Sequence, residues 1–191
     1  MELQKLNVKF FVEQPNSIPL ADFIEIFHGW IQATDGTYHD VADYSHMQAG
    51  PGIVLVAHDA NVSIDEAGGR RGLLYSQKAL MVGSNRDMLR HAFSAALENC
   101  RKLEEEPALR GKLRFSANEA VISLNDRLLG SNSKESFEEI KGDIESFAKQ
   151  LFGGAEFSFE RDGDPRQRLN IRLKTSAAVD LRQALNNLQR N

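Results

Sequence analysis

Histidines and carboxylates gather in the segment between His39 and Asp59, which holds three of the five histidines of the chain. Imidazole and carboxylate groups together can bind a divalent metal or share a proton. We therefore expect the catalytic or metal-ligating residues here to be Asp43, His46 and His58. The residues with an expected binding role in the same segment are His39, Asp40, Tyr44 and Asp59.

The local conformation decides whether this cluster can act as one site. In a helical turn, His39, Asp43 and His46 would share one face, whereas in an extended chain Asp43 and His46 would point apart. The alternative is a set of solvated loop residues, in which Asp43 and Tyr44 only hold the loop through local hydrogen bonds. The spacing matches no metal-binding signature such as H-E-x-x-H, so the solvated-loop alternative is favoured.

Two arginines stand in turn-like positions and are candidate anion ligands. Arg71 belongs to the glycine-rich segment 68–72, and Arg127 follows the apolar run 120–124. Backbone N–H groups and guanidinium forks can cradle a phosphate. A strand rather than a helix is expected after residue 72, however, so a plain hairpin turn is favoured there.

Alternating or continuous apolar runs predict the strands. The run 53–57 is almost wholly apolar and predicts a central strand that is buried on both faces, whereas 37–51 is the least regular stretch. The other expected strands are 6–12, 62–65, 72–75, 113–115, 120–124, 157–159 and 169–173, with turns at 66–71 and 117–118.

Apolar residues at helical spacing predict four amphipathic helices. Ser17 is the expected N-cap of the first, and Ser84 with Asp87 resembles a capping box for the second. The third is expected to begin at Asn132 and the last near Thr175 or Ser176. The helix stripes lie over 20–31, 89–103, 137–151 and 181–188.

These elements predict an α+β fold, with antiparallel sheet built from β-hairpins and amphipathic helices packed on one face in ββα-like repeated units. We expect residues 1–191 to form a single domain, with 1–107 and 108–191 as candidate sub-units. Cys100 is the only cysteine, which excludes a disulfide within the chain and a cysteine-based zinc site.

Several stretches look familiar as a set. They are Asp40–His46 running into Gly50–Gly52, then Ala57–Asp59, Gly72–Tyr75 and Ile122–Leu128. Together they resemble a family of uncharacterised small bacterial proteins and cover about a third of the chain. The resemblance implies a bacterial protein and transfers no catalytic residue.

Charge and hydropathy narrow the function classes. The net charge is −4, from 23 Lys and Arg against 27 Asp and Glu, so nucleic acid is not favoured as a partner. No leader-like start and no apolar stretch of membrane-spanning length is seen, so we expect a cytoplasmic protein without a membrane.

A few apolar residues have no place in the main stripes and suggest self-association through an exposed patch: Ile26, Trp30, Leu80, Met81 and Val82. The leading interpretation is a non-catalytic binding or assembly module. The alternative is a small hydrolase that depends on His and Asp, or on a divalent metal as cofactor, with its site in 39–59.

Overall fold

The computed structural model describes residues 1–14, 16–47, 50–126, 130–164 and 166–190. Within these residues eight strands and four α-helices follow one another, with one 3₁₀ turn, η1. Their bounds are β1 Leu6–Val12, α1 Asp22–Ala33, β2 Tyr38–Tyr44, β3 Gly52–Ala57, β4 Ala60–Asp65, η1 Ala67–Gly69, β5 Gly72–Gln77, α2 Asn85–Glu105, β6 Phe115–Leu124, α3 Lys134–Leu151, β7 Phe157–Arg161, β8 Asn170–Thr175 and α4 Leu181–Gln189.

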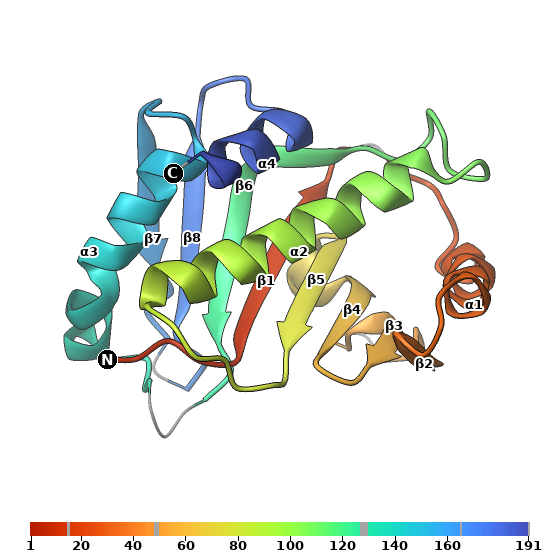
Figure 1. Ribbon diagram of the computed structural model, residues 1–191, viewed down its shortest axis with the longest axis horizontal. Coiled ribbons are helices and arrows are strands. Elements are labelled where there is room, and N and C mark those ends of the chain that lie inside the picture. Colours follow the sequence, from red (N-terminus) through yellow and green to blue (C-terminus); the bar gives the residue numbers. More distant parts are fainter. Residues whose placement is uncertain (15, 48–49, 127–129, 165, 191) are drawn as a thin grey trace.

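The eight strands form one sheet in the order β2-β3-β4-β5-β1-β6-β8-β7, and every pairing is antiparallel. Helix α2 runs diagonally across the middle of this sheet, α3 and α4 lie on the same side of it, and α1 sits at the β2 end (Figure 1). The expected α+β class with antiparallel sheet is confirmed. Strand β1 lies between β5 and β6, so both halves of the chain contribute strands to the same sheet.

The core lies between the sheet and the helices. Alternate β1 side chains, among them Val8 and Phe10, are fully buried on the face toward α2. Phe10 meets Phe93 of α2 edge-on at 5.7 Å between ring centroids, and Phe93 packs on Phe147 of α3 at 4.7 Å. Burying such rings contributes much of the folding free energy of a domain.

The predicted start of α2 is confirmed in detail. The Ser84 side chain accepts a hydrogen bond from the Asp87 backbone N–H, and the Asp87 side chain accepts one from the Ser84 backbone N–H. This capping box satisfies two of the N–H groups that a helix start leaves without partners.

Three other helix starts differ from the sequence prediction. Helix α1 begins at Asp22 rather than after Ser17, because the chain around Pro19 forms i→i+3 bonds first. Helix α3 is capped by Ser133, one residue after Asn132. Helix α4 begins at Leu181, well after Thr175, because Asp180 rather than an earlier hydroxyl accepts the N3 hydrogen bond.

The strand predictions were wrong in three places. Residues 38–44 form the edge strand β2, whose mostly exposed side chains leave little alternation to detect. The two strands expected around Ala117 and Asn118 are one strand, β6, which stays paired with β1 through a register shift. Strand β3 lies next to the edge strand rather than at the centre.

In the part of the chain that the structure describes, no helix combines the length and apolarity needed to cross a membrane.

Candidate functional site

The histidine and carboxylate cluster lies on the β2–β3 hairpin, and the pairing register separates its members. Asp43 is opposite Ile53, so His46 lies beyond the β2 end of the hairpin. His58 follows Ala57, which is opposite Tyr38 at the other end. The two ends are separated by about 16 Å, at about 3.3 Å per residue along β3.

The members of this cluster form local contacts instead of a shared site. Hydrogen bonds from Ser45 lower the pKa of Asp43, and Asp40 accepts one from the Val41 backbone. His58 and Asp59 lie 3.8 Å apart, with side chains 89% and 76% exposed. His39, Tyr44 and His46 are exposed as well. Among the described residues, no group of three His, Cys, Asp or Glu side chains could hold a metal ion.

Arg71 is engaged within the fold. Its guanidinium bonds Glu66 at 2.7 and 2.8 Å and Asn16 at 2.9 Å, and it also donates to the carbonyl of Ile18. These bonds tie the β4–β5 connection to the segment that precedes α1. The connection is a hairpin turn containing η1, as the favoured alternative predicted. Arg127, the other predicted anion ligand, lies outside the described residues.

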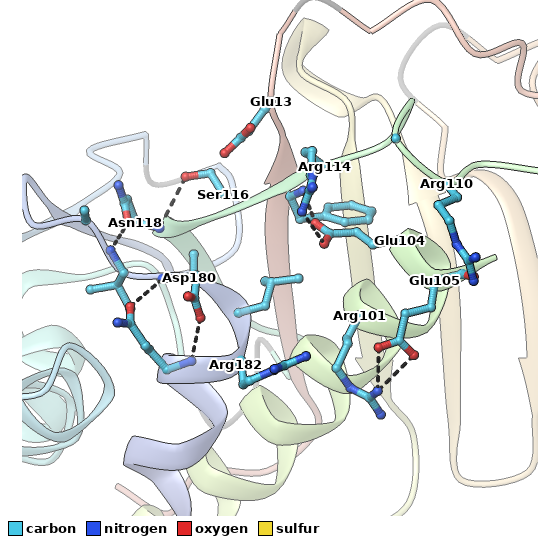
Figure 2. A pocket seen from close by; sticks show the side chains of 17 residues that line it. Glu13, Arg101, Glu104, Glu105, Arg110, Arg114, Ser116, Asn118, Asp180 and Arg182 are labelled. Atoms are coloured by element: carbon cyan, nitrogen blue, oxygen red, sulfur yellow. Dashed lines mark hydrogen bonds and ion pairs between the residues drawn. The ribbon is translucent and has the colours of Figure 1, made fainter. Parts of the chain in front are cut away.

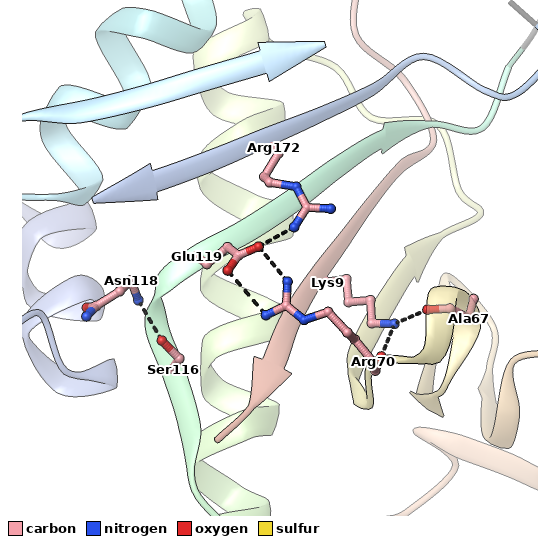
Figure 3. Close-up of polar contacts among 7 residues, drawn as sticks. All are labelled: Lys9, Ala67, Arg70, Ser116, Asn118, Glu119 and Arg172. Atoms are coloured by element: carbon pink, nitrogen blue, oxygen red, sulfur yellow. Dashed lines mark hydrogen bonds and ion pairs between the residues drawn. The ribbon is translucent and has the colours of Figure 1, made fainter. Parts of the chain in front are cut away.

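A second set of polar contacts holds this turn against the helix-free side of the sheet (Figure 3). Arg70 forms two hydrogen bonds with Glu119 of β6, at 2.7 and 3.2 Å, and its guanidinium lies 3.7 Å from the centre of the Phe11 ring. Arg172 of β8 bonds the same carboxylate. Burial alone would raise the pKa of Glu119, but the bonds from Arg70 and Arg172 lower it below its usual value. This network is structural, since both arginines bond the same Glu119 carboxylate and so hold the turn, β6 and β8 together.

A cleft lies between the C-terminal end of α2, the beginning of β6 and the segment leading into α4 (Figure 2). Its volume is about 870 Å³. Four arginines line it, which are Arg101 from α2, Arg110 and Arg114 from the α2–β6 connection, and Arg182 from α4. We call this the arginine cleft.

The arginine cleft is also lined by four acids, and three of them are bonded to the protein itself. Glu105 accepts two bonds from Arg101, both at 2.9 Å. Asp180 accepts the 2.7 Å bond of its capping box from the Gln183 backbone. Glu104 accepts a 2.7 Å bond from the Phe115 backbone and lies 3.7 Å from Arg114. The fourth acid, Glu13, lies at the rim close to Arg114 (Figure 2).

The electrostatics of Glu104 reflect its half-buried position. Burial raises the pKa of Glu104, an effect only partly offset by the hydrogen bond from Phe115 and by the charge of Arg114. The neighbouring charge of Glu13 raises that pKa further. Glu104 therefore orders the start of β6, while Arg114 stays 70% exposed beside it.

Arg110 and Arg182 use few of their N–H donors within the protein. Arg110 makes one long bond, 3.4 Å, to the Glu105 carbonyl. Arg182 makes no hydrogen bond or ion pair with any described residue. Its side chain extends from the first turn of α4 toward Arg101 (Figure 2). Each guanidinium carries five N–H donors and no acceptor, so these two groups present unused donors to the cleft.

Sequence reasoning missed this site because its members are far apart in the chain. Arg101 and Arg182 come from helices in different halves, and only the packing of α2 against α4 brings them together. Arg110, Lys112 and Arg114, close together in the chain, were the local signal of a basic loop.

No protein-family model matches this chain, and none of the curated proteins matches it either. The geometry of the arginine cleft therefore carries the functional conclusion, and the resemblance to a bacterial family stays a prediction.

Proposed function

We propose that this protein is a non-catalytic binding module that takes a small polar ligand in the arginine cleft. One observation carries the proposal: four arginines from three separate segments line a single concave surface, and two of them keep most of their donors. Four acids also line the cleft and balance these charges, but three of them already accept bonds from Arg101 or from backbone N–H groups, so Arg110 and Arg182 keep donors that a ligand can use.

The dimensions of the cleft support a small ligand. Pockets for small molecules usually enclose about 300–1,000 Å³, and this cleft encloses about 870 Å³. Phe115, Ala117 and Leu181 add apolar surface to the lining. A few placed polar groups beside apolar surface is the usual composition of such sites.

Three acids of the lining are tied into the fold, because Glu105 bonds Arg101, Asp180 caps α4 and Glu104 bonds the Phe115 backbone, and this favours binding over turnover. The serine of the lining, Ser116, accepts a 3.2 Å hydrogen bond from the Asn118 backbone N–H, and so helps shape the start of β6. The geometry does not support the alternative of a hydrolase with its site in 39–59, because the β2–β3 hairpin holds His46 and His58 at opposite ends.

The test is a fragment screen followed by two-dimensional ¹H–¹⁵N NMR of the full chain. The panel contains small anions, cations and uncharged polar compounds. We expect hits whose shifts map to residues 101–118 and 178–183, and loss of those hits in Arg182→Gln. Arg168→Gln is the matched control, because Arg168 is an exposed arginine outside the cleft. Hits that map elsewhere, or survive Arg182→Gln unchanged, would contradict the proposal.

Self-association is a second candidate, favoured by two exposed apolar side chains on the β5–α2 loop. Leu80 is 71% exposed and Val82 is fully exposed, whereas Trp30 is buried. Ile26 and Met81 pack partly against the core. We expect sedimentation equilibrium to show a dimer that is weakened in the double variant Leu80→Ser, Val82→Ser. A strict monomer at high concentration would remove this candidate.

A further inference from the structure

We propose that the ligand of the arginine cleft is a compact anion carrying two or more oxyanion groups, either carboxylates or phosphates. This inference rests on the proposed function, since it names the chemical class of the ligand for the same cleft. The shared chemistry is a set of planar or tetrahedral oxyanions that accept paired hydrogen bonds from guanidinium groups.

The hydrogen-bonding inventory of the cleft favours an acceptor-rich ligand. Three of the four acids in the lining already accept bonds from backbone or arginine groups. Arg110 and Arg182 still offer donors. Glu13 and the second oxygens of Glu104 and Asp180 stay open to a donor, so a cation is the competing ligand class, whereas an oxyanion would find guanidinium groups on more than one side of the cleft.

The spacing of the arginines favours more than one oxyanion group. Figure 2 shows Arg182 directed toward the α2 side of the cleft, where Arg101 is bonded to Glu105, and Arg114 at the β6 side, where its backbone carbonyl accepts a hydrogen bond from the Glu13 backbone N–H. One planar anion could engage the Arg101–Arg182 side, and a second group on the same molecule could reach Arg110 or Arg114. A monoanion such as acetate would use only one of these sides.

The first turn of α4 adds a smaller favourable term. Helix starts carry a partial positive charge that favours a nearby anion. Leu181 and Arg182 lie in this turn and line the cleft. Asp180 already caps the helix, so this contribution assists the arginines and does not replace them.

The inference is tested by titrating the full chain at constant ionic strength, with calorimetry and ¹H–¹⁵N NMR. The probes are citrate and pyrophosphate as multiply charged anions, acetate and methyl phosphate as their simpler counterparts, and spermidine as a cation. We expect citrate, pyrophosphate or both to bind about tenfold or more tightly than their counterparts, since one further charge-assisted bond is worth about 1.5–3 kcal/mol. Tighter binding of citrate than of pyrophosphate would indicate a carboxylate ligand, and the reverse order would indicate a phosphate ligand.

Two variants locate the binding. Arg182→Gln and Arg110→Gln should each weaken the better probe about tenfold, whereas Arg168→Gln should change its affinity by less than about twofold. Far-UV circular dichroism checks that each variant is folded. Equal affinities for multiply and singly charged probes, or tight binding of spermidine at the cleft, would overturn the inference.

The two proposals fail in different ways. If uncharged fragments shift cleft resonances and neither citrate nor pyrophosphate does, the binding function stands and the anion class is wrong. If none of the probes or fragments shifts these resonances, both proposals are wrong.

Discussion

Lys9 of β1 reaches past the intervening strand β5 to form an ion pair with Asp65 of β4, at 2.5 Å between Nζ and Oδ2. Both side chains are largely buried, and Lys9 also donates to the carbonyls of Ala67 and Arg70. The lysine therefore links β1 to β4 and to the β4–β5 turn from the helix-free side of the sheet. The pair fits because Gly72 of β5, opposite Asp65, has no side chain to block the path.

Lys9→Met should destabilise the fold by about 3–5 kcal/mol, because it leaves the Asp65 carboxylate buried without its cation. The measurement is urea unfolding followed by circular dichroism. The double variant Lys9→Met, Asp65→Asn removes both charges and should recover part of the loss. A Lys9→Met protein within about 1 kcal/mol of the parent would show that the pair contributes little.

Gly72→Ala and Gly142→Ala should change stability in opposite directions. A Cβ at residue 72 would lie 2.3 Å from the Phe10 carbonyl oxygen and 2.9 Å from Lys9 Cε, so the strands must shift. We expect a loss of about 1–3 kcal/mol, typical of overpacking.

Gly142 lies exposed within α3 with nothing within 4 Å of its Cβ position. Alanine there should add about 0.5–1 kcal/mol in urea unfolding, through its higher helix propensity. Equal effects at the two positions would contradict the close approach at Gly72.

Glu104→Gln should gain stability relative to the parent as pH rises. Burial raises the pKa of Glu104, so the folded state holds this proton more tightly than the unfolded chain. Ionised Glu104 therefore destabilises the folded state. This destabilisation is absent below the pKa of Glu104 in the unfolded chain, grows as pH rises through its pKa in the folded state, and is complete above that. Glutamine removes the charge and can still accept the Phe115 hydrogen bond. The measurement is the difference in unfolding free energy between the two proteins at about pH 4 and about pH 7. A difference that is constant or reversed between these values would mean that Glu104 is not penalised.

Lys102→Met should loosen the docking of α1 on α2. The Lys102 ammonium lies 3.7 Å from the centre of the Trp30 ring, and the Trp30 indole donates a 2.5 Å hydrogen bond to Glu106. We expect a loss of about 0.5–1 kcal/mol from the cation–π contact. Trp30 is the only tryptophan, so its fluorescence in a urea titration reports this contact directly. Lys134→Met, at the exposed start of α3, is the matched control. An unfolding midpoint that moves equally in both variants would assign the effect to charge alone.

The helices and hairpins that sequence reasoning found share one property, which is that their signal is local. The alternation of Leu6, Val8 and Phe10 predicts β1 because consecutive side chains of a strand face opposite ways. The capping box at Ser84 and Asp87 lies within four residues of chain. The fold class follows from such signals, since amphipathic elements joined by short turns can bury their apolar faces in few ways.

Strand β2 and the single strand β6 show where local signals end. Strand β2 is an edge strand with exposed polar side chains, so its pairing with β3 depends on backbone hydrogen bonds that leave little trace in residue type. Asn118 looks like a turn residue in the sequence. In the structure its side chain accepts a hydrogen bond from the Val179 backbone, a contact across 61 residues that favours a continuous strand.

The sequence by itself determined most of the elements, their amphipathic faces and the antiparallel α+β class, because these depend on neighbours a few residues apart. The tertiary structure decided which charged groups meet. Strand register separates Asp43 and His46 from His58, although they are close in the chain. The packing of α2 against α4 places Arg101 and Arg182 in one cleft, although 80 residues lie between them. Electrostatic interactions act through distance in space, and that distance is set only when the chain has folded.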